Sequence, residues 1–166
     1  MKKSYILAFD QGTTSSRSLL FDSDFNLIGI EQKEIKQYYP NDGWVEQDPE
    51  EIFITQAETA KKLLKNKNIS PDKIAGIGIT NQRESFVVWD KRSGKAVHNC
   101  IVWQDKRTAD ICESIEQKEV SNIIKRKTGL RIDPYFSSTK LMWLLKKHPE
   151  IKKEAKRGNY LFGTID

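Results

Sequence analysis

The sequence of 166 residues is poor in the side chains that bind transition metals, with two cysteines and two histidines. Cys100 and Cys112 form no CxxC pair, and His98 and His148 stand far apart along the chain. A structural zinc site takes four such ligands at short, regular spacings, so this pattern argues against one. Any chemistry must therefore be carried by other side chains.

The sequence also lacks a long hydrophobic run, and no stretch approaches the length of a membrane span. The apolar residues that follow Met1–Lys3 end before Asp10, which is too early for the hydrophobic region of a signal peptide. Asn68–Ser70 fits a glycosylation sequon, but without an export signal we treat this match as chance. We expect a protein of the reducing cytoplasm that does not insert into a membrane.

Charge is not concentrated in any one part of the chain. The net charge of +5 suits an anionic ligand, but acidic residues interleave with the basic ones nearly everywhere. The lysines between Lys140 and Arg157 interrupt apolar positions at helical spacing and no aromatic series accompanies them, which predicts a solvated helix face. We expect no nucleic-acid partner, and one globular domain over residues 1–166.

The first half of the chain predicts a hairpin, a further strand and a helix. The helix takes Asp48 as its N-cap, Pro49 as its first residue and Glu51 as the last member of a capping box. The strands are expected at Tyr5–Phe9, Ser18–Phe21 and Leu27–Ile30. The core-facing helix residues should be Ile52, Phe53, Ala57, Ala60, Leu63 and Leu64.

The second half adds strands and helices and completes an α/β pattern. Ile74–Thr80 is continuous in apolar and small residues, as in a buried central parallel strand. We attribute Gly76 and Gly78 in it to close strand–helix packing, because the third glycine of a dinucleotide-binding motif is missing. Gly158 and Gly163 have the separation of P-loop glycines, but no lysine follows, so we reject that motif. Strands are also expected at Phe86–Asp90, Ile101–Trp103 and Tyr160–Asp166, and helices from about Lys106 and at Ser138–Lys147.

The turn of the opening hairpin carries a concentration of polar groups. Asp10 ends the first apolar run, and Gly12 can adopt the positive φ that we expect of this turn. Hydroxyl residues follow from Thr13 to Ser16, and then Arg17. Concave backbone N–H groups bind anions, and a neighbouring carboxylate can hold Mg²⁺ through water. The segment is either a phosphate-binding turn or an ordinary hairpin rich in hydroxyls.

A second polar group, Asn81–Glu84, ends the strand at Ile74–Thr80, where ligands bind in open α/β sheets. Arg83 supplies donors and Glu84 an acceptor, as a polyol needs, although a surface ion pair would use the same residues. Trp103 is either an apolar wall or a core residue. Tyr135 adds an aromatic hydroxyl in a turn, or merely packs before a helix.

Together these motifs resemble the carbohydrate kinases of the actin-like, ribonuclease-H-like fold, and among them the glycerol kinases. The opening hairpin marks the wider family, whereas Asn81–Glu84 with Trp103–Gln104 is similar to the glycerol kinases and not to their sugar-kinase relatives. The resemblance covers essentially the whole chain. Its segments are Asp10–Arg17, Gly43–Pro49, Gly78–Glu84, Ile101–Gln104, Arg107–Thr108, Thr128–Leu130, Asp133–Ser137 and Phe162–Asp166.

The resemblance implies an α/β fold with a mixed sheet, an antiparallel N-terminal hairpin, parallel strands and flanking helices. It implies phosphoryl transfer from ATP, with Mg²⁺, to glycerol, giving sn-glycerol 3-phosphate. By it, Asp10 is the one catalytic candidate and metal ligand of this chain, and it lies near Mg²⁺ and contacts it through water. The nucleotide would meet Thr13, Thr14, Ser15 and Arg17. Glycerol would meet Arg83, Glu84, Trp103, Tyr135 and Thr13.

The resemblance also implies a longer chain, whose later part holds the catalytic Asp base and the adenine pocket. Because an apolar strand, Tyr160–Asp166, ends the sequence without a polar tail, we expect a truncated N-terminal domain that lacks its C-terminal partner domain. Alone it should be inactive, and the full-length protein should be a homo-oligomer. There are two alternatives to a glycerol kinase. One is another polyol or sugar kinase of the same family, and the other is a non-catalytic actin-like nucleotide-binding module.

Overall fold

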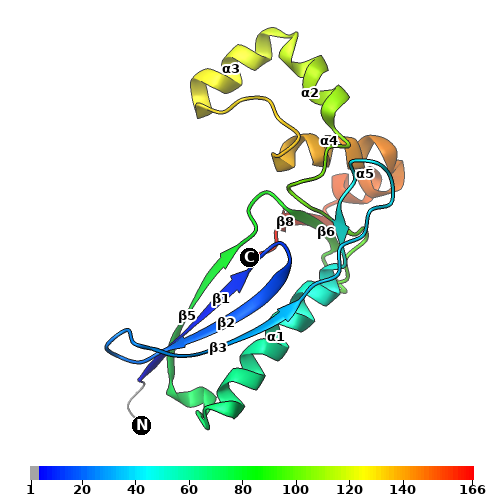
Figure 1. The fold of residues 1–166 in the computed structure, drawn as a ribbon. Helices are drawn as coiled ribbons and strands as arrows, with labels where there is room; N and C mark the ends of the chain where they lie inside the picture. The colour runs from blue at the N-terminus through cyan, green and yellow to red at the C-terminus, as the bar shows by residue number, and fades with distance from the viewer. Residues whose placement is uncertain (1–3) are drawn as a thin grey trace. The chain divides into compact units, whose positions relative to one another are not determined.

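The computed structural model describes residues 4–166, which form two compact units that we treat separately (Figure 1). Of the described residues, the first unit comprises 4–37, Gln47–Gln82 and Ile165–Asp166. The second comprises Tyr38–Glu46 and Arg83–Thr164. No helix within residues 4–166 is long and apolar enough to cross a membrane.

A four-stranded mixed sheet forms the first unit, in the order β3-β2-β1-β5 (Figure 1). Strand β1 pairs antiparallel with β2 and parallel with β5, so the predicted hairpin and the predicted mixed sheet are confirmed. The strands continue further into polar sequence than predicted, because backbone pairing does not depend on apolar side chains. They are β1 (Tyr5–Gln11), β2 (Ser15–Phe21), β3 (Leu27–Glu34) and β5 (Ile74–Asn81), the last preceded by a short 3-10 helix at Pro71–Lys73.

Helix α1 (Pro49–Asn66) begins as the sequence predicts. Asp48 accepts a hydrogen bond of 2.9 Å from the backbone N–H of Glu50, and Pro49 occupies the first turn. The predicted capping box is wrong. Oε1 of Glu51 instead accepts from the backbone N–H of Lys36 at 3.2 Å, so it binds the segment that follows β3.

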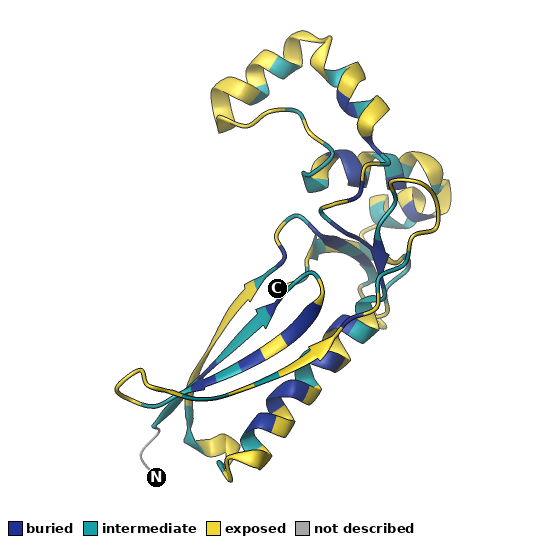
Figure 2. Ribbon diagram, in the orientation of Figure 1, coloured by how far each residue is buried: buried dark blue, intermediate teal, exposed yellow. Residues whose placement is uncertain are grey.

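Helix α1 carries buried residues along its length, dark blue in Figure 2, and these include polar ones. Ala60 and Leu63 pack with Leu7 and Leu20, as expected of a helix on a sheet. Phe53 does not, because its side chain is 72% exposed, and that part of the prediction is wrong. The residues buried along α1 are Ile52, Thr55, Thr59, Ala60 and Leu63.

Strand β5 differs most from its prediction. It is the outer strand of the described sheet, and Ile77 and Ile79 are 56% and 60% exposed, so the prediction of a buried central strand is wrong for the described residues (Figure 2). A Cβ atom added at Gly76 or Gly78 would meet nothing within 4 Å. Close strand–helix packing therefore does not account for these glycines here. An apolar run reports a tendency to be covered, not which segment covers it.

The second unit contains a second sheet, in the order β4-β7-β6-β8. Strand β6 pairs antiparallel with β7 and with β8, which confirms the predicted strands at these places. The middle prediction, Ile101–Trp103, is offset because Val102 bonds to Val45 at 3.0 Å and the chain then turns. The strands are β4 (Glu46–Gln47), β6 (Phe86–Asp90), β7 (Cys100–Ile101) and β8 (Tyr160–Thr164).

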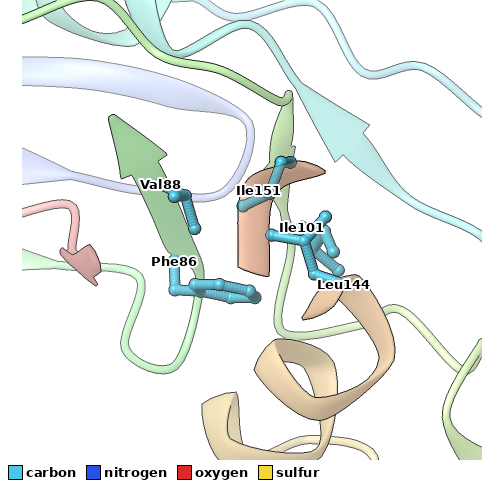
Figure 3. Close-up of a cluster of buried hydrophobic side chains, with 5 residues drawn as sticks. All are labelled: Phe86, Val88, Ile101, Leu144 and Ile151. Carbon is cyan, nitrogen blue, oxygen red and sulfur yellow. The ribbon is translucent and has the colours of Figure 1, made fainter. Parts of the chain in front are cut away.

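Two helices cover a core formed with these strands. Figure 3 shows Phe86, Val88 and Ile101 of the sheet together with Leu144 of α4 and Ile151 of α5. The helix expected from Lys106 begins later, because the N–H of Lys106 donates to the carbonyl of Gly43 at 2.8 Å. The helices are α2 (Ala109–Glu116), α3 (Glu119–Thr128), α4 (Ser137–Lys147) and α5 (Pro149–Lys156).

The basic segment at the end of the chain is a solvated helix face with one exception. Lys146, Lys147 and Lys153 are exposed, as predicted. Lys140, in contrast, has no exposed surface. The prediction is wrong for this residue because it lies in the first turn of α4 on the side that faces the unit's interior.

Candidate functional site

The turn of the opening hairpin consists of Gly12, Thr13 and Thr14 between β1 and β2. The N–H of Gly12 donates to the carbonyl of Ser15 at 2.9 Å, and Ser15 is buried at the start of β2. Gly12 does not have the positive φ that we predicted. Glycine is needed there for another reason, because a Cβ atom at this position would lie 3.1 Å from the Ser15 carbonyl oxygen.

Asp10 and Arg17 are direct cross-strand partners beside this turn. Nη2 of Arg17 lies 2.9 Å from Oδ2 of Asp10, and the side chains are 44% and 30% exposed. Their neighbours along the strands, Gln11 and Ser16, are buried, so the charged pair lies on the opposite face of the sheet. A guanidinium on this accessible face can attract an anion, and the carboxylate remains open to a hydrated cation.

The donor set fits Mg²⁺ bound mainly by phosphate and water. Within residues 4–166, no three His, Cys, Asp or Glu side chains are grouped so that they could hold a metal ion. Mg²⁺ in nucleotide sites uses one or two carboxylates plus phosphate oxygens and water. A single partly exposed carboxylate, Asp10, matches that requirement.

Two buried glutamines fix the turn by hydrogen bonds, a role that the sequence analysis did not predict. Nε2 of Gln47 donates to the carbonyl of Thr13 at 2.6 Å, and Nε2 of Gln82 donates to Oε1 of Gln47 at 2.7 Å. The backbone N–H of Gln82 donates to the carbonyl of Gln11 at 2.7 Å. Both glutamine side chains are buried. Their presence inside two motif segments, Gly43–Pro49 and Gly78–Glu84, was the available signal.

Hydroxyl pairs between β2 and α1 support the same region. Oγ of Ser16 lies 2.7 Å from Oγ1 of Thr55, and Oγ of Ser18 lies 2.9 Å from Oγ1 of Thr59. Ser16 also donates to Oε1 of Gln11 at 3.0 Å. All these groups are buried, so each hydroxyl needs such a partner, and the pairs fix the helix in register with the strand.

In the second unit, Glu84 lies at the N-terminus of α4. Its Oε2 accepts from the backbone N–H of Ser137 at 2.9 Å and from Oγ of Ser137 at 2.7 Å. Oγ of Ser137 also lies 3.1 Å from the carbonyl of Glu84. Glu84 has a left-handed backbone with φ of 68°, which turns its side chain toward the helix. The helix end stabilises the carboxylate, and Oε1 remains available to another donor.

Trp103 and Tyr135 are linked to Glu84 through neighbouring residues. Their rings meet edge to face, with centroids 5.7 Å apart. The N–H of Trp103 donates to Oγ of Ser85 at 3.0 Å, which ties it to the residue after Glu84. Both rings are half-buried, so Trp103 is neither a pure core residue nor a free surface one.

Arg83 is exposed at the same turn. It has no ion pair with Glu84, whose partner is Ser137, so the alternative of a surface pair between these two neighbours is wrong. The structure thus brings Glu84, Trp103 and Tyr135 together and leaves the guanidinium of Arg83 unconstrained by a carboxylate of the described chain.

A buried arginine organises the segment after Trp103, which sequence reasoning also missed. Nη2 of Arg107 lies 2.8 Å from both Oε1 of Glu46 and Oδ2 of Asp105. Its guanidinium carbon lies 3.8 Å from the ring centroid of Trp44 and 4.7 Å from that of Trp143. Charge pairing and stacking together hold these loops in one arrangement.

Comparison with known proteins identifies the family of this chain. Residues 5–166 match the N-terminal domain of the FGGY family of carbohydrate kinases. The chain is 53% identical over 166 residues to a glycerol kinase of Carboxydothermus hydrogenoformans, covering 100% of this chain and 33% of that protein. It is 51% identical over 167 residues to a glycerol kinase of Photorhabdus laumondii, again covering 100% and 33%.

Solved structures show the same fold. The crystal structure of Plasmodium falciparum glycerol kinase with ADP matches with a TM-score of 0.90 and 33% identity, covering 99% of this chain and 33% of that one. A ligand-bound xylulose kinase from Lactobacillus acidophilus matches with a TM-score of 0.81 and 27% identity, covering 90% and 30%. The chain thus spans about a third of the length of the relatives it matches. Since the family match extends over residues 5–166, the chain belongs to the FGGY family of carbohydrate kinases.

Proposed function

We propose that this chain is the N-terminal third of a kinase that transfers the γ-phosphoryl group of ATP to glycerol. The relatives that are about half identical over the whole chain carry the name glycerol kinase. The Plasmodium falciparum glycerol kinase was solved with ADP, the nucleotide product of such a reaction. Another sugar or polyol kinase of the family is the alternative, since xylulose kinases share the fold.

The observation that carries the proposal is the cluster of Glu84, Trp103 and Tyr135. A small polyol offers hydroxyl groups and a short carbon face, so its site needs directional polar groups and one apolar wall. Oε1 of Glu84 accepts a hydrogen bond from a substrate hydroxyl, the Trp103 ring covers the carbons, and the Tyr135 hydroxyl and the Arg83 guanidinium donate hydrogen bonds. In this proposal Thr13 also contacts the substrate.

The hairpin turn supplies the phosphate side. The backbone and hydroxyls of Thr13, Thr14 and Ser15 would bind nucleotide phosphates, with Arg17 beside them. Asp10 would hold Mg²⁺ through water, and the cation would neutralise charge on the phosphates. The catalytic base and the adenine pocket would lie outside this chain, so the 166-residue chain alone should be inactive.

The test uses the complete protein that contains these residues. ADP formation is measured with glycerol, xylulose, gluconate or no acceptor, at saturating ATP and Mg²⁺. We expect kcat/KM for glycerol to exceed that for each sugar acceptor by at least two orders of magnitude. A preference for a sugar would replace glycerol with another acceptor, and nucleotide binding without acceptor-dependent turnover would favour a non-catalytic actin-like module.

The remaining properties stay predictions. A cytoplasmic location, a homo-oligomeric full-length protein and the lack of a nucleic-acid partner rest on the sequence. The expectation that the protein does not insert into a membrane has the same basis. Size-exclusion chromatography of the complete protein measures its oligomeric state.

A further inference from the structure

Lys140 is a buried cation that contacts the backbone of Tyr135, one member of the cluster of Glu84, Trp103 and Tyr135. Its side chain has no exposed surface, and Nζ donates to the backbone carbonyl of Tyr135 at 2.5 Å. An ammonium that leaves water loses its hydration, and this loss is tolerated only where other polar or charged groups replace the water. Lys140 also lies in the first turn of α4, where the helix dipole disfavours a positive charge. If residue 140 served only to fill the core, an apolar side chain of similar volume would do so without burying a charge.

The groups that compensate this charge belong to the candidate site or to its support. Asp105, Glu84 and Asp133 act on Lys140 as nearby negative charges, and the Cys100 thiol is the other titratable neighbour. Of these, Glu84 is the proposed hydroxyl acceptor, and Asp105 is buried against Arg107. Asp133 accepts from the N–H of Tyr135 at 2.7 Å. The ammonium and Asp133 therefore hold the Tyr135 backbone from its two sides.

We propose that Lys140 is a positioning residue for polyol binding: its ammonium fixes the backbone of Tyr135, and its positive charge helps to hold the Glu84 carboxylate in place. The inference rests on the proposed function. Lys140 itself touches no substrate in this account. It acts through the Tyr135 carbonyl and the field at Glu84, so its loss should weaken acceptor binding and spare the nucleotide.

The charge state of Lys140 makes the role visible as a pH dependence. Burial, its largest influence, lowers the pKa of Lys140 to about 8, against the opposing effect of Asp105 and Glu84. Between pH 7 and 9 the ammonium is lost in the folded protein, so the KM for glycerol should rise across this range. The titration of Lys140 should not lower folding stability over this range. Its pKa is lower in the folded protein, so the unfolded chain binds more protons at this group and stability rises with pH.

The experiment measures KM and kcat for glycerol and for ATP in the complete protein from pH 6.5 to 9.5. The variant Lys140→Met removes the charge at nearly constant length, and Lys147→Met, on the exposed face of α4, is the matched control. At pH 7 we expect Lys140→Met to raise the KM for glycerol on the order of tenfold, with the KM for ATP within twofold. The wild-type rise in KM between pH 7 and 9 should be absent from Lys140→Met and present in the control.

Unchanged glycerol parameters in a folded Lys140→Met, while the wild type phosphorylates glycerol, overturn this inference and leave the proposed function standing. An equal loss for glycerol and ATP also overturns it, because a merely structural role predicts that pattern. If Lys140→Met does not fold, a wild-type KM for glycerol that stays flat from pH 7 to 9 overturns it. A wild type without glycerol-dependent turnover overturns the proposed function together with the inference.

Discussion

The side-chain amide of Gln47 donates a hydrogen bond of 2.6 Å to the backbone carbonyl of Thr13 in the hairpin turn. Gln47 is fully buried, and its side-chain oxygen Oε1 accepts a hydrogen bond from Nε2 of Gln82. The turn is therefore fixed by residues distant in sequence and not only by its own hydroxyls and glycine. A rigid turn keeps its N–H groups aimed at a bound anion, which favours a pre-organised phosphate site.

Replacing Gln47 should loosen that turn. In Gln47→Leu the Thr13 carbonyl and the Gln82 amide both lose a buried partner, which costs about 1–3 kcal/mol. We expect kcat/KM for ATP to fall roughly ten- to a hundredfold, by steady-state kinetics of the complete protein. Gln117→Leu, at an exposed position directly after α2, is the control and should change it little. Equal kinetics in the two variants would show that the Gln47 bond does not position the turn.

Asp10→Asn tests the metal role of the carboxylate. Removing the charge should lower kcat at least about a hundredfold, with the KM for glycerol nearly unchanged, because a metal contact and not an acceptor contact is lost. The melting temperature should barely move, since the partly exposed pair with Arg17 is worth only about 0–1 kcal/mol. An unchanged kcat would reduce Asp10 to a strand residue.

Arg107→Met tests the buried arginine of the second unit. The change leaves Glu46 and Asp105 without their buried cation, and such a loss costs roughly 3–5 kcal/mol. We expect the melting temperature to drop clearly. Arg126→Met, at an exposed position of α3, should leave it unchanged. Equal melting temperatures for both variants would contradict the assigned pairing.

The Cys100 thiol gives a pH-dependent prediction. Burial raises its pKa from 9.0 to about 12, so the thiol stays neutral and unreactive in the folded protein. We expect iodoacetamide at pH 8 to spare Cys100 in the native state and to modify it in denaturant, by peptide mass spectrometry. Between pH 9 and 12 the unfolded thiol ionises first, so this group's contribution to stability is lost over that range. Rapid native alkylation at pH 8 would contradict the burial.

Local signals in the sequence predicted the parts of the fold that depend on neighbouring residues. The start of α1 at Asp48 and Pro49 and the hairpin at Asp10–Arg17 are examples, because caps and turns are set within a few residues. Glu84, Trp103 and Tyr135 were selected from their places at strand ends and turns. The structure brings these three together.

Contacts between distant segments were not predictable in the same way. Lys140 looks like any other lysine of its segment, and only the surrounding acidic groups make its burial tolerable. The bond between Gln47 and Gln82 joins residues that no periodicity links. Phe53 is apolar yet exposed while Thr55 is buried, because hydroxyl pairing with β2 decides which face of α1 is covered.

We propose that the cluster of Glu84, Trp103 and Tyr135 binds glycerol for phosphorylation in the complete protein. The most direct measurement is glycerol-dependent ADP formation by the complete protein, for the wild type and Glu84→Gln side by side. We predict saturable glycerol dependence in the wild type. Glu84→Gln removes the negative charge beside the substrate hydroxyl from which Glu84 would accept a hydrogen bond. The variant should lose roughly ten- to a hundredfold in kcat/KM for glycerol, with an unchanged KM for ATP. ADP formation that does not depend on glycerol, or a variant that loses ATP affinity and keeps glycerol affinity, would contradict the account.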